Sequence, residues 1–107
     1  MKPQYLIHGL PQEWDEVARI FAALGDDHRQ RILLAFEPGE RLSIQQIAAH
    51  LSLSRTAVVH HLKSLREAGI LYSEKSGREA LYRLDVSRVK WALDALQTYL
   101  NALQQGA

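Results

Sequence analysis

Two helix-start signals lie close together in the middle of the chain and restrict its fold more than any other feature. Ser43 is followed three residues later by Gln46, which is the S-x-x-Q capping box that begins a helix. The stretch 52–54 interrupts the helical pattern, and Ser54 can cap a second, longer helix that Gly69 ends. A short helix joined to a longer one by about three residues predicts a helix-turn-helix.

A β-hairpin is predicted directly after the longer helix. Ile70-Leu71-Tyr72 and the apolar run in residues 80–84 are strand-like, and Ser76-Gly77 supplies a turn between them. A hairpin in this position is the wing of a winged helix-turn-helix. The predicted fold class is therefore mainly α with a small β-hairpin.

The remaining segments complete one small domain, as a length of 107 residues favours. Residues 1–10, with Pro3 and Gly9, predict a flexible N-terminal arm, and residues 11–107 form the domain. Helices are expected from Pro11 to Gly25, after Asp26 or Asp27, and over 86–104 after a cap at Asp85.

The last predicted helix has the apolar spacing of a coiled coil. From Val86 to Leu103 its apolar residues alternate between steps of three and four, which is an a/d seam. The seam packs either onto its own domain or, as we expect, against a second copy together with the first helix. The predicted dimer-interface residues are Val17, Phe21, Val89, Leu93, Leu96, Leu100 and Leu103.

Charge is distributed unevenly along the chain, although the net charge is only +1. Residues 54–83 contain six Lys and Arg but three acidic residues, whereas residues 1–53 contain five against seven. The central segment, which holds the helix-turn-helix and the wing, is therefore the part expected to contact a polyanion.

The longer helix has two faces. Val58, His61, Leu62 and Leu65 form an apolar stripe, and a second stripe of small, polar and basic residues lies roughly opposite. Consecutive helical residues point about 100° apart, so His60 and His61 diverge and should not bind one metal ion. We expect His61 in the core and His60 at a nucleic-acid contact or, alternatively, simply in solvent.

The outer stripe suits the major groove of B-DNA. Short polar and basic side chains match the base edges, a valine or threonine methyl matches the thymine methyl, and flanking Arg and Ser match phosphates. Basic residues beside the hairpin turn suit an adjacent minor groove or backbone, or else only keep the tip soluble. The predicted DNA-binding residues are Ser54, Arg55, Thr56, Val59, His60 and Lys63 on the helix and Lys75 and Arg78 on the wing.

Three blocks in this order resemble the ArsR/SmtB-like family of bacterial winged helix-turn-helix repressors. The blocks are FAALGDDHRQRIL at 21–33, LSRTAVVHHLKSLREAGIL at 53–71 and KSGREALYRL at 75–84. The resemblance implies a homodimer paired through its first and last helices. It also implies that each longer helix enters one major groove of a palindromic operator.

The chain departs from that family at the metal-sensing positions. Many members have a C-x-C on the third helix, but this chain has Ser43 and Gln45 there and contains no cysteine. The last helix has Asp85 and Asp94 but no histidine. We therefore expect no metal and no cofactor, although His8, His28 and His50 leave an unusual site open. The inducer is not evident from the sequence.

Other classes of protein are disfavoured. The chain lacks paired His and carboxylate motifs and a glycine-rich phosphate loop, so we expect no enzyme activity. It has no long apolar run and no signal sequence, so we expect a cytoplasmic protein without membrane contact. The sequence predicts a sequence-specific DNA-binding transcriptional regulator, acting as a repressor. The alternative is a winged-helix protein-interaction module that does not recognise DNA.

Overall fold

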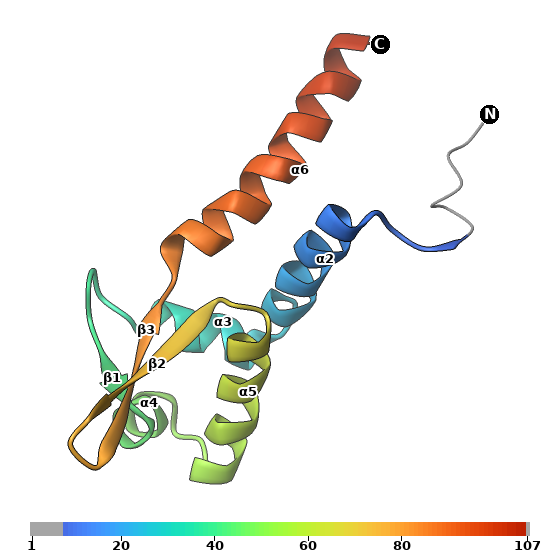
Figure 1. Cartoon of the computed structure of the whole chain (residues 1–107). Helices are drawn as coiled ribbons and strands as arrows, with labels where there is room; N and C mark the ends of the chain where they lie inside the picture. The colour runs from blue at the N-terminus through green and yellow to red at the C-terminus, as the bar shows by residue number, and fades with distance from the viewer. Residues whose placement is uncertain (1–7, 107) are drawn as a thin grey trace.

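The structure, a computed structural model, describes residues 8–106 (Figure 1). The predicted N-terminal arm lies mostly outside this range, at residues 1–7. The elements are α2 (Gln12–Leu24), α3 (Asp27–Leu34), β1 (Leu42–Ser43), α4 (Ile44–Leu51), α5 (Arg55–Glu67), β2 (Leu71–Ser76), β3 (Glu79–Leu84) and α6 (Val86–Gly106). Within this part of the chain, no helix has both the length and the apolar character required to cross a bilayer.

The helix-turn-helix consists of α4 and α5, and both predicted caps are present. The Ser43 hydroxyl accepts a hydrogen bond from the Gln46 backbone N–H at 3.2 Å, and the Ser43 N–H donates to Gln46 Oε1 at 2.9 Å. Ser54 accepts from the Ala57 N–H at 3.1 Å and begins α5. Between the helices Ser52 adopts a left-handed conformation with φ of 53°, which turns the chain sharply.

The end of α5 is fixed by a Schellman motif at Gly69. The Ile70 N–H donates to the Leu65 carbonyl at 3.0 Å, and the Gly69 N–H donates to the Arg66 carbonyl at 2.9 Å. Gly69 has a φ of 78°, and a Cβ there would lie 3.1 Å from Nε of Arg88. Glycine therefore satisfies both a backbone conformation and a close approach from α6.

The wing is part of a three-stranded antiparallel sheet with the order β1-β3-β2. Ser76 pairs with Glu79, so the hairpin loop is Gly77-Arg78, one residue later than the predicted Ser76-Gly77 turn. Gly77 has a φ of 64° and Arg78 has a negative φ, as in a type II′ turn. Strand β1 was not predicted; its Leu42 pairs with Tyr82 of β3.

The core is formed by apolar side chains from every helix and from the sheet. Val58, Leu62 and Leu65 of α5 are at most 1% exposed, which confirms the predicted inner stripe of this helix. Ile20, Ile32, Ile47 and Ile70 meet them from α2, α3, α4 and the start of the wing, each 0% exposed. The core holds α5 in place through its inner stripe and leaves the opposite side free.

Helix α6 extends away from the core (Figure 1), and it lies beside α2 as far as Tyr99, whose ring centre is 5.7 Å from that of Trp14. Ala92 is its one buried residue in the described range, and Val89 and Leu96 are half-buried. Leu93, Leu100 and Leu103 are 50%, 48% and 53% exposed. The apolar seam therefore faces solvent over much of its length in the single chain.

The two α2 residues predicted at the dimer interface differ from each other. Phe21 is half-buried, but Val17 is only 2% exposed and belongs to the core of its own chain. The place of Val17 at the interface stays a prediction, and its side chain has little surface left to contribute there. Helical spacing identifies an apolar face but not which neighbour covers it.

Arg88, in the first turns of α6, joins three helices. Its guanidinium lies 3.6 Å from the Glu16 carboxylate of α2 and 5.1 Å from the centre of the Trp91 ring. The same side chain covers Gly69 at the end of α5. Nearby, the Asp85 N–H donates to the Ile70 carbonyl at 2.8 Å. The end of α5 and the start of α6 are thus tied together.

Candidate nucleic-acid interface

The outer stripe of α5 is exposed to solvent. Arg55, Thr56, His60 and Lys63 are exposed, as is Ser54 at the cap, and Val59 is 44% exposed. The amino-terminal end of α5 and the hairpin loop lie at the same end of the molecule, opposite the free end of α6 (Figure 1). The predicted helix residues therefore share one accessible face.

A depression connects this helix to the wing. Arg55 of α5 and Arg78 of the hairpin loop line the same hollow of about 310 Å³, together with Gln45 of α4. The structure thus brings together two cationic side chains that are distant in the sequence. Gln45 is a candidate contact that the sequence did not indicate, because its place beside Arg78 depends on the pairing of β1 with β3.

A second hollow, of about 520 Å³, lies beside Lys63. Arg66 and Tyr72 also line it, and Tyr72 is 41% exposed. The guanidinium of Arg83 lies 5.9 Å from the centre of the Tyr72 ring. The helix and the base of the wing therefore offer cationic and aromatic groups on adjoining surface.

Ion pairing determines which cations remain available for a ligand. Glu74 lies 3.5 Å from both Arg41 and Arg83, so Arg83 is occupied within the protein. In residues 8–106 no ion pair involves Arg55, Lys63, Arg66, Lys75 or Arg78. The exposed cations of α5 and the wing are thus free to meet phosphates, although Glu67 and Glu79 lie nearby.

The two adjacent histidines have different environments. His60 is exposed, whereas the side chain of His61 is 14% exposed and faces α3. His61 Nδ1 lies 4.0 Å from Asp26 Oδ1, and the His28 ring centre is 5.5 Å from that of His61. The surroundings of His61 are therefore polar on one side, and not the purely apolar core that its stripe indicated.

Burial controls the protonation of His61. Desolvation lowers the pKa of His61, and the charges of Arg29 and the neighbouring histidines act in the same direction. The carboxylate of Asp26 opposes this effect. The pKa of Asp26 is itself lowered, chiefly because its carboxylate accepts a hydrogen bond from the Arg29 N–H. His61 is therefore neutral at neutral pH and serves the packing of α5 on α3.

The histidines considered for an unusual metal site do not gather. His8 and His50 are exposed, and only His28 lies beside another histidine. Over the range 8–106, no three side chains of the metal-binding types form a group that could hold an ion.

Comparison with known proteins places these features in a family. Residues 26–73 match the family model described as bacterial regulatory protein, arsR family. The HTH-type transcriptional regulator CmtR of Mycobacterium bovis is 40% identical over 75% of this chain and 67% of its own length. The matched segments include the helix-turn-helix.

Solved structures share the fold. An ArsR-like transcriptional regulator from Rhodococcus sp. RHA1 has a TM-score of 0.75 and 31% identity, and the match covers 91% of this chain and 97% of that one. A homodimeric winged helix-turn-helix DNA-binding domain from Mycobacterium bovis has a TM-score of 0.67 at 20% identity, with 100% and 94% covered. The chain therefore belongs to the arsR family of bacterial regulatory proteins, as a transcriptional regulator with a winged helix-turn-helix DNA-binding fold.

Proposed function

We propose that the protein is a cytoplasmic repressor that binds a palindromic operator as a homodimer and blocks transcription by occupying it. The observation that carries the proposal is the shared hollow of Arg55 and Arg78, because it joins the start of α5 to the hairpin loop as one cationic surface. Neither side chain has an ion-pair partner in the described residues.

In this proposal α5 lies in the major groove. Thr56, Val59, His60 and Lys63 face the base edges, where methyl groups and hydrogen-bonding atoms differ between base pairs. Ser54 and Arg55 at the start of the helix contact phosphates and fix its register. Lys75 and Arg78 contact the backbone or the adjacent minor groove.

The dimer in this proposal forms through α6, with Phe21 of α2 at its edge. A row of half-exposed leucines is costly in water, and a second copy related by a twofold axis would cover it. The homodimeric state named for the structural neighbour from Mycobacterium bovis supports this arrangement. The twofold axis predicts two operator half-sites about one helical turn apart.

The test is binding to DNA fragments selected from the genome of the source organism, including the gene's own promoter. Affinity should fall steeply as salt rises, because Lys and Arg release counterions when they contact phosphates. His60→Ala and Lys63→Ala should weaken binding without loss of fold, whereas Lys90→Ala, an exposed change on α6, should not. Absent or salt-independent binding would contradict the proposal.

One observation favours the alternative, a protein-interaction module. Val59 and Tyr72 are 44% and 41% exposed on the same side as the cations, and apolar groups of this kind anchor protein interfaces. This function predicts a stable complex with another protein in pull-downs and no shift of any selected DNA fragment. Val59→Ser would then abolish the protein complex, whereas in the DNA model it would alter base preference.

A further inference from the structure

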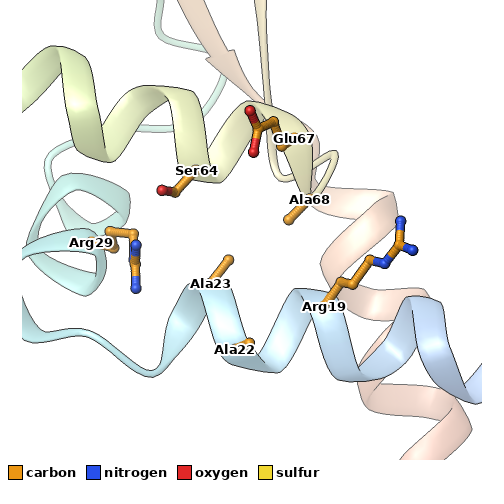
Figure 2. A pocket seen from close by; sticks show the side chains of 7 residues that line it. All are labelled: Arg19, Ala22, Ala23, Arg29, Ser64, Glu67 and Ala68. Carbon is orange, nitrogen blue, oxygen red and sulfur yellow. The ribbon is translucent and has the colours of Figure 1, made fainter. Parts of the chain in front are cut away.

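A groove lies between α2, α3 and the carboxyl-terminal half of α5, apart from the proposed DNA surface. It has a volume of about 440 Å³, within the range of small-molecule sites. Ala22 and Ala23 of α2 and Ala68 after α5 supply its apolar wall, and Figure 2 shows Ala23 and Ala68 pointing toward each other across it. The groove therefore has room for a short apolar segment between two helices.

Arg29 of α3 reaches into one end of this groove (Figure 2). Its Nε atom is buried and has no hydrogen-bond partner in the described structure. No ion pair in residues 8–106 involves Arg29 either. A buried donor without an acceptor is costly, and a guanidinium binds carboxylate or phosphate oxygens in a forked geometry. Arg29 thus forms no ion pair at this end, although the carboxylate of Asp26 is close enough to interact with its charge.

The remaining polar groups define the rest of the ligand. The Ser64 hydroxyl has only a long contact of 3.5 Å to the His60 carbonyl, so it can donate to a ligand oxygen. Arg19 adds positive charge, although Asp15 lies 3.1 Å from it. Glu67 is also in the lining, and its exposed carboxylate can accept a hydrogen bond from a donor on the ligand.

We propose that this groove binds a small molecule that carries a carboxylate or phosphate group at Arg29 and Ser64 and a hydrogen-bond donor toward Glu67. The ligand contacts α2 and α5 together, so it changes the position of α5 and thereby the affinity for DNA. This regulatory part rests on the proposed function, whereas binding itself does not. Linkage requires that DNA in turn change the affinity for the ligand by the same factor.

The experiment titrates the whole chain with inorganic phosphate and, separately, with acetate, at constant ionic strength, while backbone amide resonances are followed by NMR. Saturable shifts are expected at Arg29, Ser64 and Ala68 with at least one of the two probes. Arg29→Gln should weaken binding about tenfold, the contribution of a charge-assisted hydrogen bond. Arg31→Gln is the matched control, since Arg31 lies on the same helix but is exposed and pairs with Asp27 at 3.1 Å.

Ala22→Leu provides a second variant that adds bulk to the groove from an exposed position, so it should block the probe without disturbing the core. Shifts that fail to saturate with either probe, or that persist unchanged in Arg29→Gln and Ala22→Leu, would overturn the binding site. Phosphate that binds at Arg55 or Lys63 instead would shift amides of α5 near those residues and leave Arg29 and Ala68 unchanged, and this result would also overturn the binding site.

The regulatory part has its own readout. With a saturating probe, affinity for a selected DNA fragment should change on the order of fivefold in the wild type and not in Arg29→Gln. Equal changes in both proteins would refute regulation through the groove. If the wild type binds no DNA at all, the proposed function fails, while the amide titration still decides whether the groove binds an anion.

Discussion

Replacing Leu100 with lysine should separate the proposed dimer into folded monomers. Leu100 is 48% exposed in the single chain, and the neighbouring seam residues Leu93 and Leu103 are exposed to a similar extent. Full burial of a leucine side chain contributes roughly 1.5–3 kcal/mol, so covering the exposed half contributes about 1 kcal/mol. The fold of the monomer should survive, because the side chain contributes little to its core.

The twofold axis doubles the effect on association. Each dimer loses two leucine contacts, about 2 kcal/mol, and gains two ammonium groups that are partly desolvated or repel each other, about 1 kcal/mol more. A total of about 3 kcal/mol corresponds to roughly a hundredfold weaker dimer. DNA affinity should fall with it, because half of the contacts are lost when one subunit binds alone.

Sedimentation equilibrium over a range of protein concentrations measures the dissociation constant, and circular dichroism checks the helix content. Asn101→Lys is the matched control, because it introduces the same charge one residue later, at an exposed position that points about 100° away from Leu100. The Asn101 side chain only accepts a hydrogen bond from Gln97 at 3.0 Å, so little is lost when it is replaced. If Leu100→Lys dimerises as the wild type does, or if Asn101→Lys dissociates equally, α6 is not the interface.

Three further predictions follow from glycine geometry, histidine burial and the wing. Gly69→Ala should lower the thermal midpoint more than Gly77→Ala, since both have positive φ but only the first meets another side chain, at 3.1 Å; equal midpoints would contradict this. Folding lowers the pKa of His61, so the unfolded chain binds more protons than the folded one. The free energy of unfolding should therefore decline as the pH falls below about 6.5, until the pH passes the pKa of His61 in the folded chain. In His61→Gln the difference between the thermal midpoints measured at pH 7 and pH 5 should be smaller than in the wild type. Arg78→Ala should reduce the slope of log affinity against log salt by about 1, with Lys90→Ala as the unchanged control.

Local features of the fold could be predicted from the sequence because they depend on neighbouring residues. The capping box of Ser43 and Gln46 and the helix stop at Gly69 involve residues within a few positions of each other, and the structure confirms both. Strand β1 could not be predicted, because two residues carry no alternating pattern and their pairing with β3 spans about forty positions of sequence.

The candidate site shows the same division between near and distant residues. The outer stripe of α5 follows from helical spacing alone, so its exposure was predictable. The ion pair of Arg83 with Glu74 and the approach of Asp26 to His61 could not be predicted in this way. In each case the partner lies on another element, and neither a charge count nor a helical wheel shows which elements lie side by side. The burial of Val17 in its own chain could not be predicted for the same reason, because residues of several elements can cover one face of α2.

The junction at Arg88 has a mechanical consequence. Helix α5 is held at its carboxyl end, by Gly69 against Arg88 and by Ile70 against Asp85, while its amino end projects toward the hairpin loop. Its 13 residues make a lever about 20 Å long. Because its inner stripe ties α5 to the core, the domain and α5 would turn together at the junction, and a tilt of about 10° would move the amino end of α5 by roughly 3.5 Å, slightly more than the donor–acceptor distance of a hydrogen bond. In a dimer formed through α6, the crossing angle of the two α6 helices would therefore set the distance between the amino ends of the two α5 helices. Small changes in that angle would decide which spacing of operator half-sites the dimer fits.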